Sequence, residues 1–145
     1  MKRVSIALLL LAGIGTFVAA CDIGRDVTPS AGAPSTLAGT AWRAISVSGA
    51  ALVQGREPTL AFVDETQVNG NTGCNSFFGG YAYADGTIEF TNVGMTLMAC
   101  DDAVGTVEGA FTKALNGATS AAIDDGGQLL LSGPGGEILF APVGD

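Results

Sequence analysis

Cysteine carries the clearest chemical signal in this 145-residue chain, which has three cysteines. Cys21 directly follows Val18-Ala19-Ala20 at the end of an apolar run, an arrangement typical of the lipobox in a bacterial signal sequence. Cleavage before Cys21 makes it the mature N-terminus, which carries acyl chains on its sulfur and its amine. The pattern therefore predicts lipidation of Cys21 and a membrane anchor of several acyl chains, because a single chain binds a bilayer only marginally.

The first 20 residues contain the other parts of a signal sequence. Lys2 and Arg3 form a positive n-region. The apolar stretch from Val4 to Ala20 has about 17 residues, which is shorter than the ~20 residues of a typical transmembrane helix. An ordinary secretory signal cut near Ala20 and an uncleaved N-terminal anchor are the alternatives. We expect a lipoprotein signal peptide over residues 1–20 and a protein of the cell envelope that faces the periplasm.

The other two cysteines, Cys74 and Cys100, are expected in an exported compartment that permits disulfides. The chain has no histidine, and neither cysteine lies in a C-x-x-C motif, so a zinc site or a redox motif is disfavoured. Two interpretations remain, which are a Cys74–Cys100 disulfide and two buried free thiols.

Carboxylates are the remaining groups that could do acid-base or metal chemistry. The absence of histidine excludes a Ser-His-Asp or Cys-His arrangement. The adjacent pairs Asp101/Asp102 and Asp124/Asp125 lie where a helix cap and a turn are expected, which are ordinary places for aspartate. We therefore predict no catalytic residue, no metal site and no cofactor. The alternative is a small hydrolase or an acidic metal-binding domain that uses these surface carboxylates.

The charge of the chain limits its partners. Without the signal peptide, four basic residues remain against 14 acidic ones, a net charge of about −10. Nucleic acid is excluded as a partner, because its recognition requires clustered positive charge. Anionic lipid heads are disfavoured for the same reason, so the predicted contact with the membrane is the acyl anchor. The mature length of roughly 125 residues suits one small domain, which we expect to be monomeric.

Residues 21–36 are rich in proline, glycine, serine and threonine, which predicts a flexible linker between the lipid and the domain. Asp22 directly follows the lipidated cysteine, and in enteric bacteria an aspartate there favours the inner membrane. The folded domain is expected over residues 37–145.

Short alternating segments predict an antiparallel sheet. Trp42 marks a first strand of irregular register, and Leu60 with Phe62 marks a second one. The many glycines and asparagines between Val68 and Asn75 favour bulges and left-handed backbone over a long regular strand. Asp85-Gly86 is a strong hairpin signal.

One helix is predicted between Asp101 and Asn116, where apolar residues recur every three or four positions. Asp101 or Asp102 can cap its start and Gly117 can end it. Strands precede and follow this helix, so the predicted class is α+β, a small antiparallel sheet or cracked barrel of about seven or eight strands with one helix.

Two motifs in this sequence resemble those of a known family. The matching residues are Gly73, Cys74, Asn75, Gly79 and Tyr81 in the first motif, and Thr96, Met98, Ala99 and Cys100 in the second, followed by Glu108, Phe111 and Leu115 in the predicted helix. They are similar to the signature of the META domain, the HslJ-like family of bacterial envelope proteins. The chain departs from the pattern at Ser76 and Leu97, where family members often carry a basic residue, so an anion-binding role at these positions is not expected.

The resemblance implies a cracked antiparallel barrel with a flanking helix, similar to the pilot lipoproteins of type III secretion. Family members are linked to stress responses, and no reaction is assigned to them. The expected function is therefore a lipid-anchored, non-catalytic binding or scaffold module for envelope proteins or lipids.

Aromatic residues are candidate anchors for such a partner. Phe77, Phe78, Tyr81 and Tyr83 are clustered in one segment, where some side chains must face the core. We select Phe77, Phe78 and Tyr83 as candidates for partner binding. Asn75 is expected to stabilise the backbone of a bend.

Alternation along a predicted strand places Thr96 and Met98 on one face and Leu97 on the other. Met98 is therefore expected to fill the core.

Overall fold

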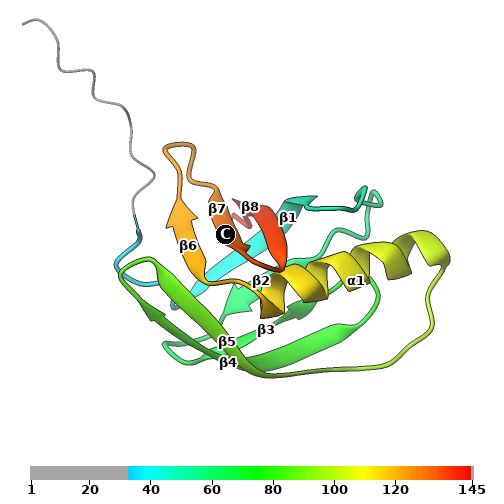
Figure 1. Cartoon of the computed structure of the whole chain (residues 1–145), viewed down its shortest axis with the longest axis horizontal. Coiled ribbons are helices and arrows are strands. Elements are labelled where there is room, and N and C mark those ends of the chain that lie inside the picture. Colours follow the sequence, from blue (N-terminus) through cyan, green and yellow to red (C-terminus); the bar gives the residue numbers. More distant parts are fainter. Residues whose placement is uncertain (1–32, 145) are drawn as a thin grey trace, which may run out of the picture.

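The structure, a computed structural model, describes residues 33–144 (Figure 1). The predicted signal peptide, Cys21 and most of the predicted linker lie outside these residues. No helix between residues 33 and 144 is long and apolar enough to cross a membrane. The elements are β1 (Thr40–Val47), β2 (Thr59–Phe62), β3 (Gln67–Asn71), β4 (Ser76–Ala84), β5 (Thr87–Met95), α1 (Asp102–Asn116), β6 (Ser120–Ile123), β7 (Leu129–Gly133) and β8 (Gly136–Pro142).

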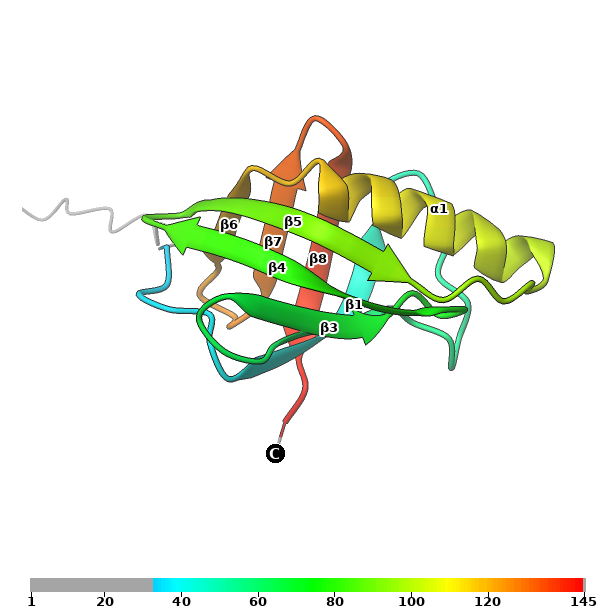
Figure 2. The same ribbon diagram turned by 90° about the horizontal axis from the view of Figure 1, so that it is seen from below.

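The strands form a closed antiparallel barrel in which each strand pairs with its neighbours in the sequence, and β8 returns to pair with β1. The pairing between β5 and β6 is the shortest, because it contains only the Thr87–Ser120 pair. Helix α1 connects these two strands and packs against β5 and β8 (Figure 2). The predicted α+β class with about seven or eight strands and one helix is confirmed.

The two strongest local signals in the sequence have the expected structures. Asp85 and Gly86 both have positive φ, 49° and 82°, as a tight two-residue hairpin between β4 and β5 requires. The Asp101 side chain accepts a hydrogen bond from the Val104 amide at 3.0 Å and caps α1. Gly117 ends the helix, with its amide donating to carbonyls of the last turn.

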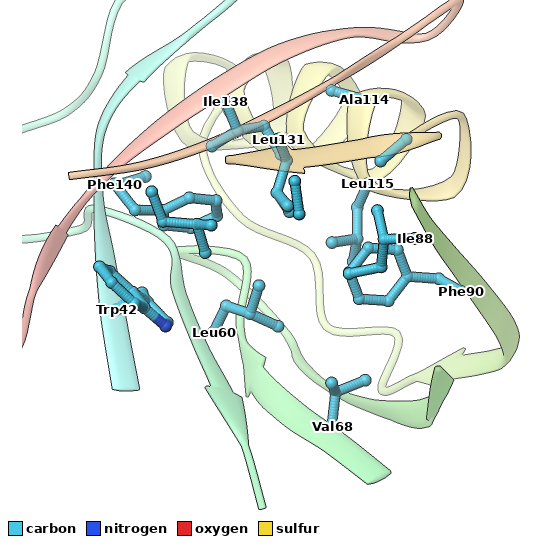
Figure 3. Close-up of a cluster of buried hydrophobic side chains, with 14 of the residues drawn as sticks. Trp42, Leu60, Val68, Ile88, Phe90, Ala114, Leu115, Leu131, Ile138 and Phe140 are labelled. Atoms are coloured by element: carbon cyan, nitrogen blue, oxygen red, sulfur yellow. The ribbon is translucent and has the colours of Figure 1, made fainter. Parts of the chain in front are cut away.

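The core lies between the barrel wall and the inner face of α1 (Figure 3). Phe111 of α1 is fully buried and contacts Phe77 of β4 and Phe140 of β8, with ring centroids 5.7 and 6.3 Å apart. Trp42 is also buried, as predicted, and its indole N–H donates to the Thr40 hydroxyl at 2.7 Å. The helix therefore covers the barrel core on the side formed by β8, β5, β1 and β7.

The predicted irregular segment between Val68 and Asn75 is only partly irregular. No long strand forms, as expected, but the expected bulge is absent from β3, a strand of five residues that pairs with β2 and β4 in regular register. Gly70 is needed there for space, because a Cβ atom would lie 2.1 Å from the Thr59 carbonyl oxygen and 2.6 Å from the Phe77 ring. The bend begins after β3, where Gly73 has φ 92°. A Cβ at Gly73 would lie 2.3 Å from the carbonyl oxygen of Arg56, so only glycine fits.

Candidate functional site

The two sequence motifs meet around the side chain of Asn75, which is 1% exposed. Its carbonyl oxygen accepts hydrogen bonds from the Met98 amide at 2.6 Å and from the Thr96 hydroxyl at 2.9 Å. Its amide nitrogen donates to the Met98 carbonyl at 3.3 Å. The Asn75 amide thus pairs with both backbone groups of Met98, as a neighbouring strand would.

Glu108 of α1 connects this arrangement to the helix. Its two carboxylate oxygens accept from the Asn75 amide nitrogen at 3.2 and 3.0 Å, and the Thr72 hydroxyl donates to the same carboxylate. The Thr72 oxygen in turn accepts from the Asn75 backbone amide at 2.9 Å. We call Thr72, Asn75, Thr96 and Glu108 the Asn75 clamp. It joins the bend after β3, the segment after β5 and the helix through buried and partly buried hydrogen bonds.

A disulfide between Cys74 and Cys100 reinforces the Asn75 clamp, with Cα atoms 6.0 Å apart and a sequence separation of 26. Of the two interpretations of these cysteines, the disulfide is therefore the one found. The disulfide joins the bend directly to Cys100, and the next residue, Asp101, caps the helix. The segment from Thr96 to Cys100 is thus fixed at both ends and in the middle.

This fixed segment exposes two large apolar side chains. Leu97 is 91% exposed and Met98 is 62% exposed, and we call these two residues the Leu97–Met98 loop. The prediction that Met98 fills the core is wrong, because β5 ends at Met95 and no strand continues through Met98. The Asn75 clamp holds the Met98 backbone while its side chain faces solvent. Sequence reasoning missed this loop, although an apolar Leu97 at a position often basic in the resembled family was a signal.

The aromatic candidates on β4 separate into buried and exposed residues. Phe77 is buried and is unavailable to a partner, so that part of the prediction is wrong. Tyr81 is also buried and donates to the Asp64 carbonyl at 2.7 Å. Tyr83 is partly buried and donates to the Pro34 carbonyl at 2.6 Å, so its hydroxyl holds the start of the domain. Burial raises the pKa of both tyrosines above its usual range.

Phe78 is the exposed candidate, at 66%, and it borders a hollow of about 460 Å³ on the outer face of the sheet. We call this hollow, with the residues that line it, the Phe78 hollow; its members are Val63, Gln67, Val68, Asn69, Phe78, Gly79, Gly80 and Asn92. None of these residues is charged. The adjacent glycines Gly79 and Gly80 form the bottom of the hollow. The hollow is deep there because the outer face of β4 carries no side chain at Gly80.

A bulge in β5 shapes one wall of the Phe78 hollow. The register between β4 and β5 shifts between Phe78 and Gly80, so that Asn92 and Val93 lie opposite Gly79. Asn92 has φ 51°, a left-handed conformation that asparagine tolerates better than most residues. Bulges of this kind often redirect a side chain next to a functional site. Sequence reasoning missed Gln67, Asn69 and Asn92, since isolated amides have no spacing that marks a site.

The acidic pairs lie in local structures rather than in a common site. Asp101 caps α1, and Asp102 begins the same helix. Asp124 accepts a hydrogen bond from the Gln128 amide at 2.9 Å and stabilises the turn before β7. Between residues 33 and 144, no group of three or more histidine, cysteine, aspartate or glutamate side chains is arranged to hold a metal ion.

Comparison with known proteins identifies relatives of this chain. The META domain profile matches residues 35–143. An NMR structure of a protein from Burkholderia xenovorans is similar over 85% of this chain and 100% of its own, with 28% identity and a TM-score of 0.60. A second NMR structure covers 70% of this chain and 86% of its own, with 20% identity and a TM-score of 0.58, and supports the fold alone. No functionally curated protein matches the chain.

Proposed function

Because this chain belongs to the META domain family, and because its two family motifs build a rigid support for exposed apolar side chains, we propose that it is a non-catalytic binding module. In this proposal the protein is anchored in the bacterial envelope through lipid on Cys21. It binds an envelope protein through the Leu97–Met98 loop.

The observation that carries the proposal is that the Leu97–Met98 loop is both exposed and held. A flexible apolar loop loses conformational entropy when it binds, about 0.5–1.5 kcal/mol for each long side chain that becomes fixed, in addition to the backbone cost. Here the backbone of Met98 is already fixed by Asn75, and Cys100 is fixed by the disulfide. Binding therefore loses less backbone conformational entropy. Covering Leu97 and Met98 then contributes about 1.5–3 kcal/mol to the free energy of binding for each side chain.

The position of the loop favours a protein over the bilayer as its partner. The start of the described chain lies at the β4–β5 hairpin, where Tyr83 contacts Pro34 and Gly86 faces Ala33. The Leu97–Met98 loop follows the other end of β5, beside the start of α1 (Figure 2). A strand of nine residues separates the two ends by about 30 Å. A tether from Cys21 would therefore enter the domain at the end opposite the loop.

The non-catalytic part of the proposal rests on how the carboxylates are used. Asp101 and Asp124 accept hydrogen bonds from backbone amides of a cap and a turn. Glu108 accepts from Asn75 and Thr72 and belongs to the Asn75 clamp. These carboxylates have structural partners, so each of them supports the fold of the domain.

The test is crosslinking in cells with the full chain, its signal sequence included. A photoreactive amino acid replaces Leu97 in one strain and Val143, another exposed apolar residue, in a second strain. The same chain with Cys21→Ala serves as the control without the lipid anchor. We expect one protein to be crosslinked from position 97 and not from position 143, and the yield to fall in the Cys21→Ala chain.

The affinity of the captured protein and the crosslinking yields together decide the result. The captured protein, purified, should bind the chain with an affinity that falls about tenfold in Met98→Ser. Crosslinks from position 97 to lipid alone, or equal yields at positions 97 and 143, would contradict a protein-docking role for the loop. Equal crosslinking yields with and without Cys21 would contradict the lipid anchor. The docking role would then be judged from the comparison between positions 97 and 143.

A further inference from the structure

We propose that the Phe78 hollow binds a neutral oligosaccharide. This site lies on the outer face of β2–β5 and is separate from the Leu97–Met98 loop, so the proposal does not rest on the proposed function. Its evidence is the combination of one exposed aromatic ring, several exposed amides and a lining without charge.

Phe78 supplies the surface on which a sugar ring can stack. The tip of its ring lies over Gly94 of β5, where a Cβ atom would come within 3.3 Å of the ring. The absence of a side chain at Gly94 therefore lets the ring rest against the sheet while 66% of the residue stays exposed. The face of an aromatic ring is negative and attracts the weakly positive C–H bonds on one face of a sugar.

Three amide side chains line the same hollow as Phe78. Gln67 and Asn69 come from β3, where Asn69 pairs directly opposite Phe78, and Asn92 comes from the β5 bulge. All three residues are exposed. A carboxamide has donors and acceptors in one group, as a pair of neighbouring sugar hydroxyls has, so the two groups can exchange hydrogen bonds in both directions.

The charge of the lining selects the kind of ligand. The chain has a net charge of −8, and its carboxylates are spread over many turns and strands, yet none of the residues that line this hollow is charged. A phosphate or carboxylate ligand would find no cation here, and it would be repelled by the protein as a whole. A cationic ligand would find no carboxylate among the lining residues, and the carboxylate at the edge, Asp64, already accepts hydrogen bonds from Thr66 and Gln67. A neutral ligand with many hydroxyl groups is the one that this lining complements.

The hollow is also preformed. Its lining comes mostly from paired strands, and its volume of about 460 Å³ lies in the range of about 300–1,000 Å³ found for small-molecule sites. Sites built on strands hold their side chains more precisely than sites on loops.

The test is calorimetric titration of the full chain in a detergent without a sugar headgroup. The neutral probes are linear tetramers of N-acetylglucosamine, of β-1,4-linked glucose and of α-1,4-linked glucose, which separate a wall-type glycan from a storage-type glycan. Tetramers of galacturonate and of glucosamine are the anionic and cationic probes. We expect at least one neutral tetramer to bind below about 10 mM, and both charged tetramers to bind at least tenfold more weakly.

Two variants test the residues. Phe78→Ala is expected to weaken binding about tenfold, because it removes the stacking surface. Asn92→Gly should weaken binding about threefold while the left-handed backbone is kept, because glycine favours positive φ. Val143→Ser is the matched control, because Val143 is exposed and lies outside the hollow and the loop, and it should bind as the wild-type chain does. Failure of every neutral tetramer to bind, equal binding of the charged ones, or full binding by Phe78→Ala would each overturn the proposal.

Discussion

The Leu97–Met98 loop and the Phe78 hollow both expose large apolar side chains, but they are held in different ways. The loop depends on a few side chains from distant parts of the chain, which are Asn75, Glu108 and the Cys74–Cys100 disulfide. The hollow depends on the backbone pairing of β3, β4 and β5, with the core directly beneath. The loop can therefore be released by a local change, whereas the hollow can be lost only with the sheet.

This difference separates two ways of building a surface. Backbone ladders tolerate most outward-facing substitutions, because the pairing groups are not in the side chains. A loop held by buried side chains fails when one partner is removed, because the remaining polar groups stay buried without hydrogen bonds. The same substitution made at two residues of one type, one in each kind of support, tests this difference.

The largest effect is expected from the adjacent pair Phe77 and Phe78. Phe77→Ala should lower the free energy of unfolding by about 3–5 kcal/mol, because Phe77 is buried against Phe111 and leaves a cavity. Phe78→Ala should change it by less than about 1 kcal/mol, since the side chain is mostly exposed. Urea unfolding of both variants measures the difference. Similar losses would mean that the Phe78 ring is part of the core.

The second effect concerns the disulfide. Cys74→Ser combined with Cys100→Ser should lower the free energy of unfolding by about 3 kcal/mol, mainly through the greater entropy of the unfolded chain. Hydrogen exchange should rise more in the segment from Thr96 to Cys100 than in β4, where it should rise by no more than the global loss of stability requires. Cys21→Ser is the matched control and should leave both measurements unchanged. Exchange in β4 that rises beyond the global loss would show that the two regions are not independent.

The sequence predicted most of the elements, because their signals are local. The Asp85-Gly86 hairpin and the Asp101 cap each depend on residues a few positions apart. The Asn75 clamp depends on contacts between residues 21 to 36 positions apart, and no periodic pattern records such distances. Met98 was therefore misplaced, since its exposure follows from the hydrogen bonds of Asn75.

The division between Phe77 and Phe78 was also beyond the sequence. Alternation shows that two adjacent aromatic residues face opposite sides of a strand, but not which side is the core. The bulge opposite Gly79 then shifts the register between β4 and β5. The order of residues along β4 therefore does not predict which residues of β5 lie beside them. The amides around Phe78 are brought together only by this pairing.

The third prediction compares two asparagines. Asn75→Ala should lower the free energy of unfolding by about 2 kcal/mol, because it removes the Asn75 partner of the Met98 amide and carbonyl and leaves Glu108 with Thr72 as its remaining donor. Asn69→Ala, on the exposed face of β3, should change it by less than about 0.5 kcal/mol. Denaturant unfolding measures both, and protease cleavage after Leu97 or Met98 reports release of the loop. Equal stability of the two variants would contradict the role of Asn75 in holding the loop.

The smallest effect is a pH dependence at the edge of the Phe78 hollow. The Asp64 carboxylate accepts hydrogen bonds from the Thr66 amide at 2.7 Å, the Thr66 hydroxyl at 3.0 Å and the Gln67 amide at 2.8 Å. These bonds, that of the Thr66 amide first, hold the pKa of Asp64 below its ordinary value.

A carboxyl group with a lowered pKa in the folded state stabilises the fold above its ordinary pKa of about 3.9. That contribution is lost as the pH falls through the lower, folded-state pKa. Asp64→Asn keeps an acceptor for the turn but cannot titrate, so the variant should lose less stability than the wild-type chain between pH 5 and about pH 2. Urea unfolding across this range compares the two chains, and parallel curves of unfolding free energy against pH would show that Asp64 does not couple this edge to pH.

Because Gln67 follows the same turn and lines the hollow, the NMR signal of the Gln67 amide should shift as Asp64 titrates. Signals from the Leu97–Met98 loop should not follow that titration.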